Sequence, residues 1–217
     1  MTQNSMTNLD RIRRRRIVPV VILEKEESAE PLAEALLKAG LDIMEITFRT
    51  DAAECAIRRI ATKFPEILLG AGTVLEPEQL RRAIGAGAKF IVAPGLNENI
   101  VRAAKAADCD MFPGVMTPSD VEKALGLGCR ILKFFPAEAA GGVAMLKALE
   151  GPYSHTGVSF IPTGGISAAN MRTYLERPSV AAIGGSWMVE KQLIAARDWT
   201  GIEQLTRAAL AAAAGKA

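Results

Sequence analysis

Short apolar segments of strand length recur along the chain, and most of them end in glycine or proline. Apolar runs bounded by residues that break strands and permit tight turns predict buried β-strands. The predicted strands are IVPVVIL (17–23), DIMEITF (42–48), ILLGAGT (67–73), KFIVAPG (89–95), DMFPG (110–114), RILKFFP (130–136), VSFIPTGG (158–165) and VAAIGGS (180–186).

Segments with helical periodicity lie between these strands. The segment SAEPLAEALLKAG (28–40) opens with Ser28 as a possible N-cap, places leucines and alanines on one stripe, and stops at Gly40. Four further helices are expected at 76–87, 117–128, 167–176 and 201–214. The third of the five contains Ser119-x-x-Glu122, which predicts a capping box at its start.

Strands that alternate with helices predict βαβ units and a parallel sheet. Eight such units fit an α/β fold of the (β/α)8 TIM-barrel type, formed by residues 1–217 as a single domain. A doubly wound sheet is the main alternative. It would need a glycine-rich motif after the first strand, and VILEKEES contains none.

An extra helix is expected before the first strand, because Met6, Leu9 and Ile12 have helical spacing and would face the core. It carries the arginine run RIRRRR (11–16). Such a run can bind phosphate or nucleic acid, but runs of like charge are more often a solvated face, which is the interpretation we favour.

Composition narrows the function classes. The chain has 217 residues, of which 49% are hydrophobic, and a net charge of +2, so no overall charge favours a nucleic-acid partner. The apolar run 17–23 is too short to span a membrane and is followed by charged residues, so no membrane partner is expected. The three cysteines, Cys55, Cys109 and Cys129, are far apart and predict reduced thiols in a cytoplasmic protein.

His155 is the only histidine. A metal site with several histidines is therefore impossible, which argues against metal-dependent aldol chemistry of the usual kind. A Ser-His-Asp triad would have to use His155, which lies in the polar connection GPYSHTG and is better interpreted as a surface residue.

Lys133 interrupts an apolar strand. Because side chains alternate along a strand, Lys133 shares the barrel interior with Ile131 and Phe135, while Leu132 and Phe134 face the helices. A lysine in a buried strand costs free energy unless its charge is paired or its pKa falls.

The second strand carries a matching anomaly at Glu45. Its expected interior face consists of Ile43, Glu45, Thr47 and Arg49, and its outer face of Met44, Ile46 and Phe48. Lys133 and Glu45 could form a purely structural ion pair. The glycine pairs that follow the seventh and eighth strands favour a catalytic or binding site over a purely structural ion pair.

Two glycine pairs, in IPTGGIS (161–167) and AIGGSW (182–187), follow the seventh and eighth strands. Barrels often build a phosphate site from the loops at these two places, using backbone N–H groups. The glycine pairs allow close approach of the backbone, and Ser186 adds a hydroxyl donor.

An interior lysine beside a carboxylate points to amine catalysis. A lysine removed from water has a lowered pKa, and its neutral amine can attack a ketone to form an iminium ion, which is an electron sink for cleavage of a C–C bond. Glu45 can transfer the protons, and Arg49 and Thr73 at neighbouring strand ends can bind a ketone or carboxylate.

Six fragments occur in order across nearly the whole chain: EITFRT (45–50), GAGTV (70–74), APG (93–95), KFFPAEAAGG (133–142), PTGGIS (162–167) and GGSW (184–187). Together they resemble the 2-keto-3-deoxy-6-phosphogluconate (KDPG)/4-hydroxy-2-oxoglutarate (KHG) aldolase family. The resemblance implies a homotrimeric, cytoplasmic class I aldolase on a barrel, with no metal and no other cofactor. It implies cleavage of KDPG to pyruvate and D-glyceraldehyde 3-phosphate in the Entner–Doudoroff pathway, and related members act on 4-hydroxy-2-oxoglutarate.

The resemblance also implies residue roles. Lys133 would form the Schiff base and Glu45 would be the general acid/base. Arg49 and Thr73 would bind the carboxylate region of the 2-keto acid, with Pro94 lining the site, and Phe135 is a further implied substrate-binding residue. The residues implied around the distal hydroxyls and the sugar phosphate are Thr163, Gly164, Gly165, Gly185 and Ser186.

Two alternatives stay open at the level of the residues. A phosphate-binding barrel isomerase or epimerase would use Glu45 as a base and Lys133 as its electrostatic partner. A non-catalytic barrel that binds sugar phosphates would keep the two residues as a buried ion pair.

Overall fold

Within the described part of the chain, the strands pair only in parallel. The computed structural model describes residues 6–215. One sheet has the strand order β5-β4-β3-β2-β1-β9, and a second has the order β6-β7-β8. The strands are β1 Ile17–Val21, β2 Ile43–Thr47, β3 Leu68–Gly72, β4 Phe90–Val92, β5 Asp110–Phe112, β6 Gly114–Val115, β7 Ile131–Phe134, β8 Ser159–Pro162 and β9 Ile183–Gly185. The predicted parallel α/β architecture is therefore confirmed.

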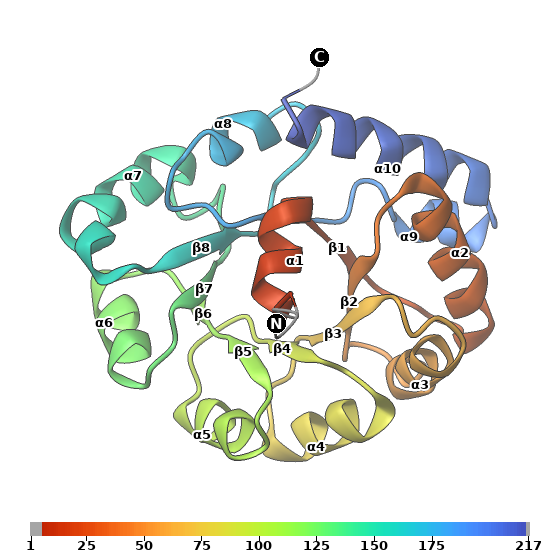
Figure 1. Ribbon diagram of the computed structural model, residues 1–217, viewed down its shortest axis with the longest axis horizontal. Helices are drawn as coiled ribbons and strands as arrows, with labels where there is room; N and C mark the ends of the chain where they lie inside the picture. The colour runs from red at the N-terminus through yellow and green to blue at the C-terminus, as the bar shows by residue number, and fades with distance from the viewer. Residues whose placement is uncertain (1–5, 216–217) are drawn as a thin grey trace, which may run out of the picture.

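The helices lie outside the strands, with the exception of α1 (Figure 1). They are α1 Asn8–Arg15, α2 Ala29–Ala39, α3 Ala53–Lys63, α4 Pro77–Ala86, α5 Glu98–Ala106, α6 Pro118–Gly126, α7 Gly142–Tyr153, α8 Met171–Leu175, α9 Lys191–Ala195 and α10 Trp199–Ala213, with short 3-10 turns η1 Glu26–Ser28 and η2 Ser154–Thr156. All five helices predicted between and after the strands are present. The helix expected at 167–176 is shorter than predicted, because the Asn170 side chain accepts a hydrogen bond from the Ser167 N–H and holds the preceding residues in a turn.

The capping box of α6 was predicted at the wrong residues. It is formed by Thr117 and Asp120, not by Ser119 and Glu122. Pro118 occupies the first helical position, where its missing N–H costs nothing, so the N-cap falls on the residue before it. The Glu122 carboxylate instead accepts a hydrogen bond from the Tyr153 hydroxyl.

Apolar side chains form two separate clusters, one on each side of the strands. The inner cluster contains Ile43 and Ile131, and the outer cluster contains Met44, Ile46, Leu132 and Phe134. This is the alternation predicted for β2 and β7. Lys133 and Glu45 therefore lie on the inner side, among the strands.

Isolated contacts join the two sheets. Only Pro113 separates β5 from β6, and its carbonyl accepts a hydrogen bond from the Lys133 N–H at 2.9 Å. On the other side, single bridges connect Phe160 with Val180 and Thr163 with Gly184. The strands thus surround the inner cluster (Figure 1).

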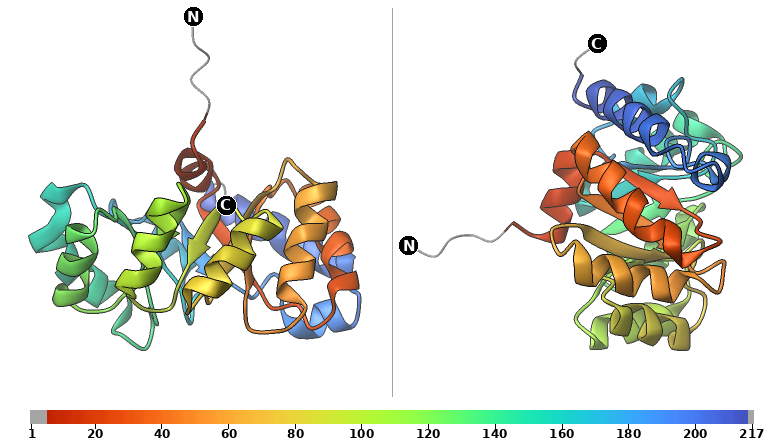
Figure 2. Two further views of the ribbon diagram at one scale, coloured as in Figure 1. Left: turned by 90° about the horizontal axis from the view of Figure 1, so that it is seen from below. Right: turned by 90° about the vertical axis from the view of Figure 1, so that its right-hand side faces the viewer.

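Helix α1 lies across the amino-terminal ends of the strands and projects from one face of the molecule (Figures 1 and 2). Its Ile12 is fully buried in the inner cluster and Leu9 packs against it, as predicted. Met6, expected to face the core, is 51% exposed. It precedes the helix, which starts at Asn8 behind a Thr7 cap, so the helical spacing does not extend to it.

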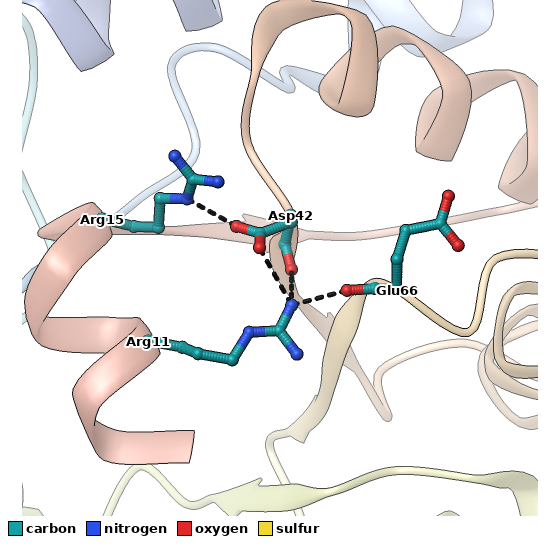
Figure 3. Close-up of polar contacts among 4 residues, drawn as sticks. All are labelled: Arg11, Arg15, Asp42 and Glu66. Atoms are coloured by element: carbon teal, nitrogen blue, oxygen red, sulfur yellow. Dashed lines mark hydrogen bonds and ion pairs between the residues drawn. The ribbon is translucent and has the colours of Figure 1, made fainter. Parts of the chain in front are cut away.

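The arginine run is not simply a solvated face. Arg11 and Arg15 both bind the Asp42 carboxylate, at 3.0 and 2.6 Å, and Arg11 also donates to the carbonyls of Asp42 and Glu66 (Figure 3). Arg16 donates to the Leu175 carbonyl. Arg11 and Arg15 thus bind α1 to the residues that precede β2 and β3. Within residues 6–215, no helix combines the length and hydropathy needed to cross a membrane.

Candidate active site

Lys133 and Glu45 meet inside the ring of strands, as predicted. Lys133 comes from β7 and Glu45 from β2, and their side chains are 3.7 Å apart between Nζ and Oε1. Both residues are buried, with exposures of 5% and 3%. The separation is longer than a hydrogen bond, and Glu45 Oε1 has no hydrogen-bond partner among the described residues. Lys133 and Glu45 attract each other electrostatically but do not form a hydrogen bond. The Glu45 carboxylate can therefore accept a proton from a third group.

The surroundings of the pair are almost entirely apolar. Besides Lys133 and Glu45, the cavity is lined by Val18, Phe90, Val92, Phe112, Ile161 and Thr163. A wall of this kind lowers the local dielectric, so charges in the cavity interact more strongly than they do in water. The cavity has a volume of only about 10 Å³, so a substrate has to reach the amine and the carboxylate from the ends of the strands.

Glycine on β3 makes room for the Glu45 carboxyl. A Cβ placed on Gly72 would lie 1.9 Å from Glu45 Oε1, and one on Gly70 would lie 2.1 Å from the Phe90 ring. Both glycines pair with β2 in the parallel ladder, Gly70 directly opposite Glu45. Gly70 and Gly72 of β3 are therefore needed because any larger residue would collide with Phe90 or Glu45. The sequence alone did not indicate this role.

The three residues expected to bind the keto acid follow neighbouring strands. Arg49 lies just beyond β2, is exposed, and has no ion-pair partner among the described residues. Thr73 follows β3 with φ at +54°, which is strained for a β-branched residue and typical of functional sites. Pro94 follows β4 and is half-buried, with its carbonyl packed so closely against Gly114 that a Cβ there would lie 2.0 Å away.

Phe135, the residue after β7, lies over the lysine. Its ring centroid lies 5.2 Å from Lys133 Nζ, within the range of a cation–π contact. The ring also approaches the backbone of Gly164. Phe135 thus stands between the amine and the first glycine pair.

The two glycine pairs lie side by side, as predicted. Thr163 and Gly184 form a bridge between β8 and β9, and a Cβ on Gly184 would lie 2.3 Å from Thr163 Oγ1. Gly164 and Gly165 have φ of +99° and +79°, which favours glycine. Within residues 6–215 the N–H groups of Gly164, Gly165 and Ser186 have no intramolecular acceptor. Unpaired N–H groups on adjacent loops are suited to an anion such as phosphate.

Other candidate nucleophiles lie outside this site. His155 is exposed on η2, as predicted. Burial raises the pKa of Cys109 to about 11 and also raises the pKa of Cys129, while a hydrogen bond with Glu26 raises the pKa of the exposed Cys55. These thiols are therefore poor sources of thiolate. In the part of the chain that the structure describes, no cluster of three or more His, Cys, Asp or Glu side chains could hold a metal ion.

Three residues near the first glycine pair were not singled out from the sequence: Glu138, Asn170 and Tyr174. The Tyr174 hydroxyl donates a hydrogen bond to the Glu138 carboxylate, and the Asn170 side chain donates to the Gly165 carbonyl at 3.0 Å. Glu138 lies in the fragment KFFPAEAAGG, but Tyr174 and Asn170 are ordinary helix-region residues. No sequence signal shows that they meet.

Comparisons with known proteins agree with this geometry. The family model for KDPG and KHG aldolase matches residues 9–205. The chain is 45% identical over 207 residues to the 2-dehydro-3-deoxy-phosphogluconate aldolase of Haemophilus influenzae, covering 95% of this chain and 97% of that protein.

Solved structures of aldolases have the same fold. The KDPG aldolase of Legionella pneumophila, crystallised with pyruvate captured as a covalent carbinolamine intermediate, is 39% identical and superposes with a TM-score of 0.89 over 93% of this chain and 97% of that chain. The 2-keto-3-deoxy-6-phosphogluconate aldolase of Zymomonas mobilis with 3-phosphoglycerate is 38% identical, with a TM-score of 0.87 over 95% and 97% of the two chains.

Proposed function

Because the chain belongs to the KDPG and KHG aldolase family, we propose that it is a class I aldolase that cleaves KDPG to pyruvate and D-glyceraldehyde 3-phosphate. The observation that carries this proposal is the buried pair of Lys133 Nζ and Glu45 Oε1, 3.7 Å apart in an apolar cavity. The carbinolamine of pyruvate in the Legionella relative supports a covalent amine mechanism.

In this mechanism the Lys133 amine adds to the C2 ketone to give a carbinolamine, and loss of water gives an iminium ion. Glu45 takes the proton of the C4 hydroxyl as the bond between C3 and C4 breaks. The electron pair of that bond moves to the iminium nitrogen, which leaves an enamine of pyruvate and releases the aldehyde. Protonation at C3 and addition of water then release pyruvate and restore the amine.

We assign binding roles to the residues at the strand ends. Arg49, which has no ion-pair partner within residues 6–215, is available for the carboxylate of the keto acid, and Thr73 and Pro94 follow the next two strands. Phe135 lines the cavity entrance over the lysine.

The far end of the substrate is assigned to the two glycine pairs. The residues are Thr163, Gly164, Gly165, Gly185 and Ser186. Within residues 6–215, the N–H groups of Gly164, Gly165 and Ser186 have no acceptor, so they suit the distal hydroxyls and the phosphate. The Zymomonas relative was crystallised with a phosphorylated three-carbon acid, which is consistent with this assignment.

A second substrate is 4-hydroxy-2-oxoglutarate, since the matching family model covers KHG aldolase as well. This substrate has no phosphate, so its cleavage would use the amine and carboxylate without the glycine pairs. An isomerase or epimerase would use Glu45 alone as a base and would form no covalent adduct with pyruvate.

The architecture belongs to the same proposal. We take β5 and β6 as one strand interrupted at Pro113, so that eight strands close into a (β/α)8 barrel in one catalytic domain. We further propose that three chains assemble into a homotrimer, and that the enzyme acts in the cytoplasm, where its three free cysteines would stay reduced.

The proposal is tested by borohydride reduction in the presence of pyruvate. We expect a stable adduct on Lys133, none on a Lys133→Ala variant, and normal trapping on Lys147→Ala, which removes an exposed lysine of α7. Pyruvate release from KDPG should be lost in the first variant and retained in the second. An adduct on another lysine, or no adduct at all, would refute the mechanism.

A further inference from the structure

The loop that carries the first glycine pair, residues 163–166, is fixed through its carbonyl groups. Three consecutive carbonyls of this glycine loop accept hydrogen bonds from outside the loop. The contacts are Ala137 N–H to the Thr163 carbonyl at 2.8 Å, Glu138 N–H to the Gly164 carbonyl at 3.0 Å, and Asn170 Nδ2 to the Gly165 carbonyl at 3.0 Å. Because these three carbonyls are hydrogen-bonded, the orientations of the peptide groups that follow Thr163, Gly164 and Gly165 are fixed.

Glu138 is itself held in place from the other side. The fully buried Tyr174 of α8 donates its hydroxyl proton to the Glu138 carboxylate. Glu138 also packs tightly on the glycine loop, since a Cβ on Gly165 would lie 2.6 Å from Glu138 Cγ. Burial, together with the hydrogen bond to Glu138, raises the pKa of Tyr174, so the hydroxyl remains a donor throughout the physiological pH range.

The same contacts connect the glycine loop to the strand that bears the lysine. Ala137 and Glu138 lie three and four residues beyond the end of β7, which ends one residue beyond Lys133. Asn170 in turn is fixed by the Ser167 N–H, which donates to its Oδ1 at 2.8 Å. The loop is therefore held against the end of the lysine strand on one side and against the start of α8 on the other.

We propose that Tyr174, Glu138 and Asn170 are positioning residues for phosphate binding by the glycine loop. They do not touch the substrate. Asn170 and the Glu138 N–H bind the loop through its carbonyls, and Tyr174 holds Glu138, so that the N–H groups of Gly164 and Gly165 stay unpaired and fixed in orientation. The inference rests on the proposed function, because it specifies how that site recognises a phosphorylated aldehyde.

The two tyrosines of the chain provide a matched experiment. Tyr174→Phe removes only the hydroxyl that holds Glu138. Tyr153→Phe removes the same group from an equivalent pair of a buried tyrosine and an exposed glutamate, in which the Tyr153 hydroxyl donates to Glu122 at 2.9 Å between α7 and α6. Each variant would be assayed with KDPG, with 4-hydroxy-2-oxoglutarate, which has no phosphate, and with inorganic phosphate as a competitive inhibitor.

We expect Tyr174→Phe to raise KM for KDPG and the inhibition constant of inorganic phosphate by roughly tenfold, the usual effect of losing a hydrogen bond to a charged group. Its kcat/KM for 4-hydroxy-2-oxoglutarate and its rate of pyruvate trapping on Lys133 should not change. Tyr153→Phe should leave all four quantities unchanged. Equal losses on both substrates, or no loss on either, would overturn the inference.

Two further substitutions keep the test decisive if Tyr174→Phe does not fold. Glu138→Gln retains an acceptor for the tyrosine hydroxyl and should keep KM for KDPG near the wild-type value, whereas Glu138→Ala should raise it. Asn170→Ala, at a partly exposed position, should raise the same constant without affecting trapping. If the wild-type chain cleaves neither substrate and traps no pyruvate, the proposed function fails. If it cleaves both but Glu138→Ala and Asn170→Ala lose no phosphate affinity, only the inference about the positioning residues fails.

Discussion

At the scale of single residues, the site depends on small side chains as much as on ionisable ones. Lys133 and Glu45 supply the chemistry, but the carboxyl can occupy its position only because Gly72 on the next strand has no Cβ. The position of Glu45 is therefore set by the volume of a neighbour, which makes it sensitive to the addition of one methyl group.

We expect Gly72→Ala to lower kcat for KDPG cleavage at least about tenfold and to destabilise the fold by about 1–3 kcal/mol, because the Glu45 carboxyl must leave its buried position. Gly85→Ala is the matched control, since a Cβ at this helical position meets nothing within 4 Å. It should stabilise the protein by up to about 1 kcal/mol through helix propensity, with kcat unchanged. Urea unfolding and steady-state kinetics measure both effects, and a Gly72→Ala enzyme with full kcat would show that the clearance is irrelevant.

The sequence was informative about residues wherever a simple period governs the structure. Alternation along β2 and β7 was enough to place Glu45 and Lys133 on one interior face. It could not reveal the strained φ of Thr73 or the meeting of Tyr174 with Glu138. Both depend on contacts between segments whose relative positions are set only by the folded molecule.

At the scale of elements, helix α1 closes the amino-terminal side of the strands opposite to the site. It contributes Ile12 to the inner cluster and holds Asp42, the residue before β2, with two arginines. Burial alone would raise the pKa of Asp42. The hydrogen bonds from Arg15 and Arg11 outweigh it, and the pKa lies below its ordinary value of 3.8.

This direction determines how stability depends on pH. A carboxyl whose pKa is lowered by folding stabilises the native state at every pH above its unfolded pKa, and loses that contribution as the pH falls through its folded pKa. We expect Asp42→Asn to cost about 1–2 kcal/mol of unfolding free energy at pH 7, because two charge-assisted hydrogen bonds are weakened. The difference from wild type should be constant down to about pH 5 and shrink below pH 4.

Denaturant unfolding of both proteins between pH 3 and pH 7 would measure this prediction. Glu78→Gln provides the control, since the Glu78–Arg81 pair is exposed and such pairs contribute little. It should leave the unfolding curve unchanged at every pH. A cost of Asp42→Asn that persisted undiminished at pH 3 would mean that the arginine contacts are not its cause.

Element boundaries were predicted less well than element types. Helix α2 ends at the predicted Gly40, where positive φ favours glycine. The cap of α6 was misplaced because a proline at the first helical position, rather than a serine-glutamate spacing, decides where that helix begins. The function of the arginine run was also missed, since its acceptor, Asp42, is distant in sequence.

At the scale of the whole molecule, two large apolar side chains that follow strands β3 and β6 are exposed to solvent. Leu75 follows β3 and is 50% exposed, and Met116 follows β6 and is 43% exposed. Neither lies on a loose loop, because their N–H groups donate to the side chains of Gln79 and Asp120 at the start of the next helix. Large apolar side chains held outward on rigid segments are typical of protein interfaces.

The proposed homotrimer therefore makes a prediction about these two side chains. The double variant Leu75→Glu, Met116→Glu would bury two unpaired charges in the interface. We expect it to sediment as single 23.1 kDa chains in analytical ultracentrifugation, whereas the wild type should sediment as a trimer. Leu205→Glu, on α10, is the control, as Leu205 is also exposed but lies on the outer helix layer. Lys133 and Glu45 meet within a single chain, so the dissociated variant should still trap pyruvate on Lys133. A trimer that survives both substitutions would place the interface elsewhere, whereas a monomer that no longer traps pyruvate would show that the strand ends need a neighbouring chain to keep their geometry.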